Sequence, residues 1–246
     1  MLESMSLRGR VALVTGGNGG LGKAIAAGLI AGGATTTVSG RDRAKNSNVR
    51  EKIDGLAEVF ELDVRDEMSA ESVISEIVTK FGRLDVLINC AGSFRGGAAV
   101  ELSLDDWEEV ISSHLTGTFI CLKVAAKAMI QGGRGGKIIN IGSMYSLFGA
   151  PDFADYAAAK AGVLGLTRSF AVELGRHHIQ VNAILPGWYE TDLTRGMPET
   201  ATGEEIRRRT PAGRWGRPDD LVAIAVLLAS PASDFISGAC IPVDGG

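Results

Sequence analysis

The side chains with the clearest chemical potential are a tyrosine, a lysine and a serine. Tyr156 and Lys160 stand at positions i and i+4, which places them on one face of a helix. Ser143 lies upstream, just past the apolar run 137–141. A phenol beside an ammonium can exchange a proton with a substrate, and a hydroxyl can donate to a developing oxyanion. The trio predicts proton transfer at a carbonyl or alcohol oxygen.

The ordinary pKa of a tyrosine, about 10, is too high for efficient base catalysis near neutral pH. We therefore expect the Lys160 ammonium to favour the phenolate and lower the pKa of Tyr156. Taken singly, each residue has a plainer interpretation. A tyrosine on an alanine-rich helix often only packs, and a lysine one turn later is often solvated.

A glycine-rich loop follows the apolar run 11–14, near the start of the chain. It contains Gly16, Gly20 and Gly22, with Asn18 and Leu21 between them. Glycines allow a tight turn and a close approach to a pyrophosphate, and the following helix offers free N–H groups. The sequence holds 33 glycines in 246 residues, so a glycine pattern alone is weak evidence. The alternative is a tight turn without a ligand.

Two more strand ends carry candidate nucleotide contacts. Asp63 could accept a hydrogen bond from an adenine amino group, although it could equally cap the next helix. Asn89, Ala91 and Gly92 follow another apolar run, where small residues leave room for a dinucleotide. A simple exit from strand to loop is the alternative there.

Short apolar runs alternate with longer helical patterns along the whole chain. This alternation predicts an α/β fold with a single Rossmann-type, doubly wound parallel sheet of about seven strands in the order 3-2-1-4-5-6-7, with helices on both faces. We expect one catalytic domain over residues 1–246, with a mobile substrate loop at 187–213. The predicted strands are 10–15, 34–39, 57–62, 84–90, 137–141, 179–185 and 239–242, and the predicted helices are 21–31, 67–81, 105–130, 155–176 and 218–229, with a short one near 49–53.

Composition narrows the class of protein. The formal net charge is -4, hydrophobic residues make up 45% and aromatics 6%. Without a long basic run, nucleic acid is not an expected partner. No run of about 20 apolar residues predicts a membrane span.

The N-terminus lacks a signal-peptide pattern, so we expect a cytoplasmic protein. Cys90, Cys121 and Cys240 are expected to be free thiols, and no metal-ligand cluster stands out.

These motifs together resemble the short-chain dehydrogenase/reductase family over residues 8–246. The resemblance rests on the glycine loop, the strand ends, the Ser/Tyr/Lys trio, Pro186-Gly187 with Thr191, and the ending Val243-Asp244-Gly245-Gly246. It implies a Rossmann fold, NAD(P)-dependent alcohol/carbonyl chemistry and a homotetramer formed through the helices at 105–130 and 155–176.

The resemblance also assigns roles residue by residue. It implies a catalytic Ser143, Tyr156 and Lys160, the last two also touching the cofactor. Cofactor contacts are implied for Gly16, Asn18, Gly20, Leu21, Gly22, Arg41, Asp63, Val64, Asn89, Ala91, Gly92, Pro186, Gly187 and Thr191.

Two positions depart from the family pattern. Cys90 replaces an asparagine at a site expected to be buried. His114 stands where the family carries a catalytic asparagine that holds a water linking the lysine to solvent. A histidine titrates near neutral pH and can bind water through a ring nitrogen, so we expect either that it replaces the relay or that the relay is altered. Packing within the helix is the alternative.

The choice of nucleotide depends on the end of the second predicted strand. Gly40 occupies the position where an acidic residue would bind the ribose 2′-OH of NAD. Arg41 follows and can pair with a 2′-phosphate, which favours NADP(H). NAD(H) stays possible, because Asp42 is adjacent and no basic residue precedes Gly20.

The substrate is expected to be a small molecule held by Ser143, Tyr145, Trp188 and Arg95, with Tyr189, Phe148 and Arg195 nearby. Aromatic side chains with arginines suit a secondary alcohol or ketone on a sugar or sugar acid. The overall pattern resembles family members labelled glucose or gluconate dehydrogenases. A 3-oxoacyl-thioester reductase is the alternative, with the arginines 207–209 as a docking face. A non-catalytic dinucleotide-binding sensor on the same fold is a third.

Overall fold

A computed structural model describes residues 3–93 and 96–246. Seven parallel strands form one sheet in the order β3-β2-β1-β4-β5-β6-β7, which confirms the predicted order. The strands are β1 (Val11–Thr15), β2 (Thr35–Gly40), β3 (Glu58–Glu61), β4 (Val86–Asn89), β5 (Gly136–Ile141), β6 (Ile179–Pro186) and β7 (Cys240–Val243).

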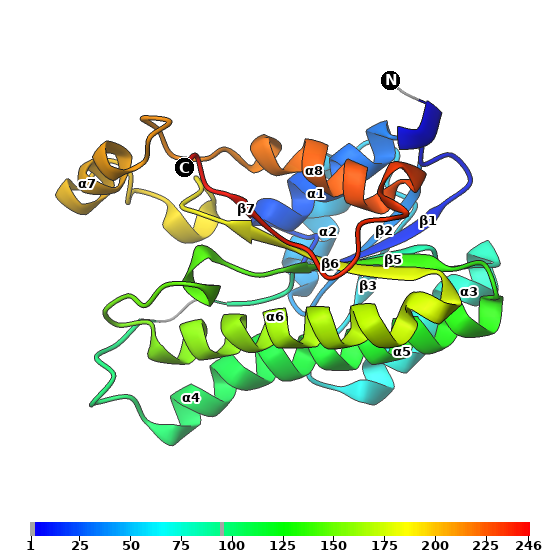
Figure 1. Ribbon diagram of the computed structural model, residues 1–246, viewed down its shortest axis with the longest axis horizontal. Helices are drawn as coiled ribbons and strands as arrows, with labels where there is room; N and C mark the ends of the chain where they lie inside the picture. The colour runs from blue at the N-terminus through cyan, green and yellow to red at the C-terminus, as the bar shows by residue number, and fades with distance from the viewer. Residues whose placement is uncertain (1–2, 94–95) are drawn as a thin grey trace.

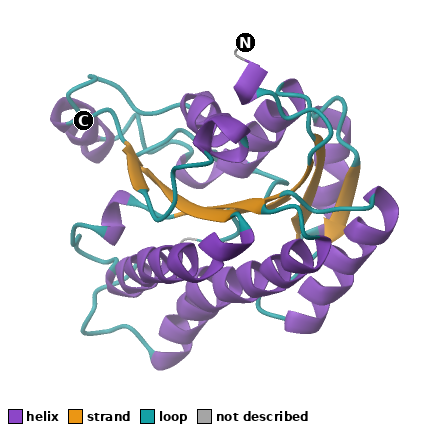
Figure 2. Cartoon of the chain, turned by 45° about the vertical axis from the view of Figure 1, so that its right-hand side comes forward, coloured by secondary structure: helices purple, strands orange, loops and turns teal. Residues whose placement is uncertain are grey.

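Helices cover both faces of the sheet (Figures 1 and 2). They are α1 (Gly20–Ala31), α2 (Arg43–Lys52), α3 (Glu67–Phe81), α4 (Leu104–Ile111), α5 (Gly117–Gly132), α6 (Ala154–Leu174), α7 (Ala201–Arg209) and α8 (Val222–Ala229). The predicted Rossmann-type α/β fold is therefore confirmed. None of the helices in the described part of the chain is long and apolar enough to span a membrane.

Side-chain alternation along β1 shows how one strand serves two cores. Val11 and Leu13 pack with α3, α5 and α6 on one side of the sheet. Ala12 and Val14 pack with α1 and α8 on the other. A strand that is buried on both faces consists of a continuous run of apolar residues, and this run is why β1 could be predicted from the sequence.

Two helices differ from their predicted extents. The helix expected near 49–53 is the longer α2, which begins after Asp42; the Asp42 carboxylate accepts a hydrogen bond from the backbone N–H of Lys45. The helix expected over 105–130 is two helices, α4 and α5, joined by a π-helical turn at Ser112–Thr116. π-turns inside helices are common at functional sites, and this one contains His114.

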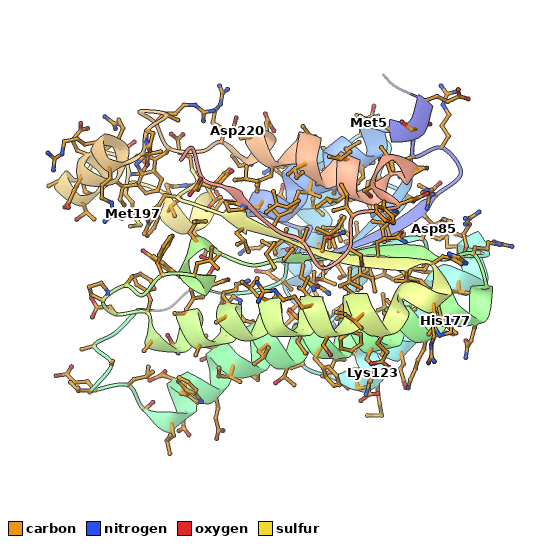
Figure 3. The ribbon with its side chains drawn as sticks, viewed as in Figure 1. Met5, Asp85, Lys123, His177, Met197 and Asp220 are labelled. Atoms are coloured by element: carbon orange, nitrogen blue, oxygen red, sulfur yellow. The ribbon has the colours of Figure 1, made fainter. Side chains whose placement is uncertain are left out.

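The strands all point toward one edge of the sheet. Asp85 and His177, which precede β4 and β6, lie at one end of the molecule, and Met197, beyond β6, lies at the other (Figure 3). In parallel α/β sheets ligands bind beyond the carboxyl ends of the strands. The candidate site is therefore expected at the end of the molecule that carries Met197 and α7.

Candidate active site

The Ser/Tyr/Lys trio meets at the carboxyl end of β5. Ser143 follows β5 and begins a short 3-10 turn at Met144–Ser146, where its Oγ accepts a hydrogen bond from the Tyr145 N–H at 3.1 Å. Its hydroxyl also hydrogen-bonds the phenol of Tyr156, from the first turns of α6. Lys160 Nζ, one helical turn farther on, donates to the Ile141 carbonyl at 2.6 Å.

Burial dominates the protonation of Tyr156 and Lys160. It raises the pKa of Tyr156 to about 12, against the hydrogen bond from Ser143, which favours the phenolate. It lowers the pKa of Lys160 to about 8. The expectation that Lys160 lowers the pKa of Tyr156 is therefore wrong. Nζ lies 5.7 Å from the centre of the Tyr156 ring and is bonded to the Ile141 carbonyl instead.

His114 is packed directly behind the trio. Its ring meets the Tyr156 ring edge-on at 5.1 Å between centres, and its Nε2–H donates to the carbonyl of Ser93. A side chain at Gly92 would collide with the imidazole, since a Cβ there would lie 2.2 Å from Cε1. Nδ1 is buried and has no hydrogen-bond partner among the described residues.

The surroundings of His114 keep it neutral. Burial, together with the positive charge of Lys160, lowers its pKa to about 3, although the hydrogen bond to Ser93 acts in the opposite direction. The expectation that His114 titrates near neutral pH is therefore wrong. A neutral ring that donates through Nε2 leaves Nδ1 as a buried acceptor.

The glycine loop forms a cradle without side chains after β1. Gly16 has φ +67°, and a Cβ there would lie 2.7 Å from the Cα of Ala91. A Cβ on Gly22 would lie 2.5 Å from the Gly16 carbonyl oxygen, and Gly20 has φ +48°. Only glycine fits such positions without strain. The exposed backbone next to the N-terminus of α1 therefore suits a pyrophosphate.

Thr15 fixes the loop after β4 against this cradle. Its Oγ1 accepts hydrogen bonds from the N–H groups of Cys90 and Ala91 at 3.2 and 3.3 Å. Sequence reasoning assigned Thr15 no separate role, although it stands at the head of the glycine motif. Asn89, in contrast, turns into the sheet, where its amide donates to Asn140 at 2.9 Å.

The end of β2 offers a cation beside an amide cluster. Asn18 donates to Asn46 at 2.8 Å, and a side chain on Gly40 would collide with Asn18. Arg41 is exposed, whereas Asp42 is engaged as the cap of α2. Of the two charges considered at this strand end, the cation is therefore the one free to meet a nucleotide.

The two candidate adenine contacts differ in their surroundings. Asp63 forms an ion pair with Arg65 at 2.6 Å, and this pair lowers the pKa of its carboxyl. The cap of α3 is Asp66 and not Asp63. Val64 is buried against Gly117. Leu21 packs against the core on the α1 side.

The segment after β6 faces the cradle from the opposite side. Pro186 ends β6, and Gly187 packs closely against Asp244 near the end of the chain. Thr191 lies beside Gly20, 3.9 Å from where a Cβ of that glycine would be. A hollow of about 570 Å³ opens between this segment and α1, lined by Gly20, Lys23 and Thr191 among others.

Aromatic rings line the approach to Tyr156. Tyr145 lies 6.4 Å from Tyr156 and 6.2 Å from Trp188, measured between ring centres. Trp188 in turn contacts Trp215 at 5.4 Å. Trp215 was missed by sequence reasoning, because it lies far along the chain beyond α7. Of the arginines expected here, Arg95 falls outside the described residues.

Tyr189 does not line this approach, contrary to expectation. It is buried in the core, and its hydroxyl donates to the Val243 carbonyl at 2.8 Å. Residues alternate sides along an extended segment, so Trp188 and Tyr189 face opposite ways.

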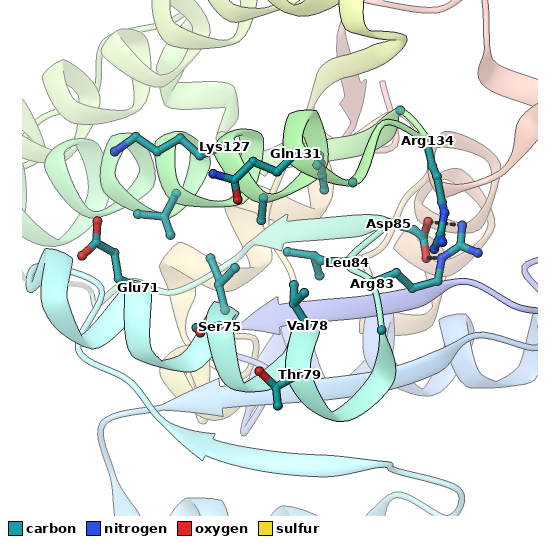
Figure 4. Close-up of a pocket in the computed structure, with 17 residues that line it drawn as sticks. Glu71, Ser75, Val78, Thr79, Arg83, Leu84, Asp85, Lys127, Gln131 and Arg134 are labelled. Atoms are coloured by element: carbon teal, nitrogen blue, oxygen red, sulfur yellow. Dashed lines mark hydrogen bonds and ion pairs between the residues drawn. The ribbon is translucent and has the colours of Figure 1, made fainter.

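A second hollow, of about 430 Å³, lies between α3 and α5 (Figure 4). Arg83, Asp85 and Lys127 line it, with Arg83 and Asp85 paired to each other. It opens at the amino ends of the strands, at the edge opposite the trio. Ser143, Tyr156 and Lys160 do not line it.

Comparison with known proteins decides the family. A family profile described as "Enoyl-(Acyl carrier protein) reductase" matches residues 16–246. The chain belongs to the short-chain dehydrogenase/reductase family. It is 40% identical to the 2-dehydro-3-deoxy-D-gluconate 5-dehydrogenase of Escherichia coli, over 100% of this chain and 98% of the relative.

Other relatives of the family carry different substrate names. A 3-oxoacyl-[acyl-carrier-protein] reductase of Thermotoga maritima is 37% identical over 98% of this chain and 99% of its own length. The crystal structure of a gluconate 5-dehydrogenase from Burkholderia cenocepacia, in complex with NADP and tartrate, superposes with a TM-score of 0.94 at 37% identity. That match covers 100% of this chain and 97% of the other. The predicted family membership is confirmed.

Proposed function

We propose that this protein is an NADP(H)-dependent dehydrogenase that interconverts a secondary alcohol and a ketone on a sugar acid. The observation that carries the proposal is the convergence of Ser143, Tyr156 and Lys160 beside a bare glycine cradle. Relatives named for gluconate substrates, and a related structure named with NADP, support the substrate and the nucleotide.

In this proposal each residue of the Ser/Tyr/Lys trio has a separate catalytic role. When bound, the nucleotide supplies or accepts the hydride. Ser143 donates a hydrogen bond to the substrate oxygen, and Tyr156 gives that oxygen a proton during reduction. The raised pKa of Tyr156 keeps it a phenol at neutral pH, which suits the donor role. Lys160 Nζ, with a pKa of about 8, then exchanges a proton with its surroundings near working pH.

The nucleotide site follows from the strand ends. In this proposal the pyrophosphate lies on Gly16, Gly20 and Gly22, and the 2′-phosphate pairs with Arg41. Thr191 closes the nicotinamide side, and the segment 187–213 moves over the substrate. We further propose that residues 1–246 act as one catalytic unit in the cytoplasm.

A homotetramer is part of the proposal. Trp107, Phe119 and Val172 are exposed apolar side chains on α4, α5 and α6, with Val172 85% exposed. Exposed apolar side chains on these helices are consistent with a contact between subunits at this face. Light scattering on the purified protein tests it: a mass of four chains supports the assembly, and a monomer contradicts it.

Turnover with both nucleotides tests the function. We expect activity with gluconate or 2-dehydro-3-deoxygluconate and NADP(H), and much less with 3-oxoacyl thioesters. The Thermotoga relative keeps the thioester reductase as the second candidate. If the enzyme turns over a 3-oxoacyl thioester faster than the sugar acids, the thioester reductase becomes the first candidate function. Nucleotide binding without turnover of any substrate would favour the sensor.

A further inference from the structure

Tyr145 is held directly beside the catalytic pair Ser143 and Tyr156. Its backbone N–H donates to Ser143 Oγ at 3.1 Å, which fixes the two residues relative to each other. Its ring meets the Tyr156 ring edge-on, with 6.4 Å between the ring centres. A small molecule whose reacting oxygen lies at Ser143 and Tyr156 therefore comes within reach of the Tyr145 side chain.

Neighbouring rings hold the Tyr145 side chain in place. Phe153 packs against it at 5.1 Å between ring centres, and the Trp188 indole meets it edge-on at 6.2 Å. Trp188 in turn packs on Trp215 at 5.4 Å. We call Tyr145, Trp188 and Trp215 the aromatic wall. Because other rings pack against the phenol, its hydroxyl has a defined place in the wall.

The polar atoms of the aromatic wall differ in what they can still bind. Trp215 Nε1, the only polar atom of its side chain, already donates to the Gly203 carbonyl at 3.0 Å. Neither Phe153 nor Trp188 can accept the hydrogen of the Tyr145 hydroxyl, because a phenyl ring has no polar atom and an indole only donates. Within the described wall, the Tyr145 hydroxyl therefore has a hydrogen that it can donate to a bound molecule.

The Tyr145 phenol also stays protonated at neutral pH. It is partly buried, and burial raises its pKa above the ordinary value of a tyrosine. A phenol that keeps its hydrogen can both donate to and accept from a hydroxyl group. This chemistry suits a neutral alcohol group of a ligand.

We propose that the Tyr145 hydroxyl binds a hydroxyl group on the substrate carbon next to the reacting carbon. This rests on the proposed function and adds a specificity residue to it. Ser143 and Tyr156 take the reacting oxygen, so the neighbouring phenol meets the adjacent carbon of the same molecule. A site built to hydrogen-bond a substrate hydroxyl rejects the analogue that lacks it, because the polar group of the site is then left unpaired. The site thus selects vicinal diols and α-hydroxy ketones, which sugar acids contain, over simple alcohols and ketones.

The test compares gluconate with 4-deoxygluconate and 6-deoxygluconate in the wild type and in Y145F. Each analogue lacks one of the two hydroxyls beside carbon 5, the carbon in the name of the related gluconate 5-dehydrogenase. The wild type should prefer gluconate over one of them, the analogue that lacks the bound hydroxyl. Y145F should lower kcat/KM for gluconate by about 3- to 10-fold, the range for one neutral hydrogen bond.

The two analogues separate recognition from a general loss of activity. For the analogue that lacks the bound hydroxyl, Y145F should keep the wild-type kcat/KM, so that the preference for gluconate over this analogue disappears. For the other analogue, Y145F should lose as much as it does for gluconate. Calorimetry of gluconate binding in the presence of NADPH, a pair that cannot react, should show the same order of affinities without turnover.

Y189F is the matched control, because it removes the same atom from a phenol that donates to the Val243 carbonyl at 2.8 Å inside the core. Its preference for gluconate over the analogues should equal that of the wild type. A Y145F variant that keeps the wild-type preference, or a wild type that does not distinguish gluconate from either analogue, overturns the inference and leaves the proposed function standing. Equal losses for gluconate and both analogues in Y145F, or the same change of preference in Y189F, overturn it too. If the wild type neither binds nor oxidises gluconate or 2-dehydro-3-deoxygluconate, the proposed function fails, and the inference fails with it.

Discussion

At the scale of single residues, His114 shows how surroundings override an intrinsic property. The sequence alone predicts a ring that titrates near neutral pH, because the ordinary pKa of histidine is about 6.5. In the folded chain the ring is buried beside Lys160, and its pKa falls to about 3. The proximity of Lys160 and the hydrogen bond to the Ser93 carbonyl could not be predicted from sequence spacing, because Lys160 lies on another helix and Ser93 follows a separate strand.

His114 should therefore leave the pH–rate profile flat between pH 6 and 7. If Nδ1 holds a water of the relay, H114N keeps most of the activity and H114L slows proton transfer. If His114 only packs, H114L is the milder change. Measuring kcat against pH for both variants separates these outcomes. An inflection near pH 6.5 that disappears in H114N would contradict the lowered pKa.

The lowered pKa of His114 also predicts that the folded protein loses stability as the pH falls. A histidine with a lower pKa in the folded chain binds fewer protons there than when unfolded, so its contribution to stability is present above about pH 6.5 and declines as pH falls toward 3. The maximum slope for one such group is about 1.4 kcal/mol per pH unit. Unfolding by urea across this range should show a shallower decline in H114N. If the free energy of unfolding falls with pH at the same slope in H114N and in the wild type, His114 does not contribute to the loss of stability in acid.

Nucleotide choice should depend on Arg41. R41A removes the cation that we propose pairs with the 2′-phosphate, so it should weaken NADPH binding about 10-fold or more and NADH binding little, since only NADPH carries that group. Arg43 is a matched control, because it is already paired with Glu61 at 2.7 Å. Fluorescence titration measures the affinity of each variant for NADPH and for NADH. Equal losses of NADPH and NADH in R41A would reject the role.

At the scale of elements, the glycine loop and strand β1 show which features a sequence predicts well. A continuous apolar run located β1, and the following glycines located the turn. The π-turn at Ser112–Thr116 was missed because one extra residue in a turn hardly disturbs an apolar pattern. The first half of α2 was missed because its residues are polar, so that no apolar period marks it.

The cradle itself can be tested by adding one methyl group. G16A places a Cβ 2.7 Å from Ala91 at a left-handed φ of +67°, so it should destabilise the fold by about 1–3 kcal/mol and abolish nucleotide binding. G19A is the control for stability, because among the described residues only its own chain neighbours lie within 4 Å of its Cβ position. Chemical denaturation of both variants checks the difference. Equal stability of G16A and wild type would contradict the tight packing.

At the scale of the whole molecule, both helical layers could be predicted from the alternation, because parallel strands need crossover helices. The sheet order is the one expected of a Rossmann-type fold. The composition of the aromatic wall could not be predicted in this way. Tyr145, Trp188 and Trp215 come from three separate segments, and their meeting depends on how those segments fold over the sheet edge. Tyr189 was misplaced for the same reason, since only the fold reveals which of two adjacent side chains turns inward.

The central claim is that Tyr156 supplies the proton in an NADPH-dependent reduction of a sugar-acid ketone. The most direct measurement is the rate of NADPH oxidation by Y156F with the ketone formed from gluconate, beside NADPH binding to the same variant. We predict a loss of about 10²- to 10⁴-fold in kcat with nucleotide affinity retained, because the ring still packs but the proton donor is gone. Turnover of Y156F near the wild-type rate would contradict the account.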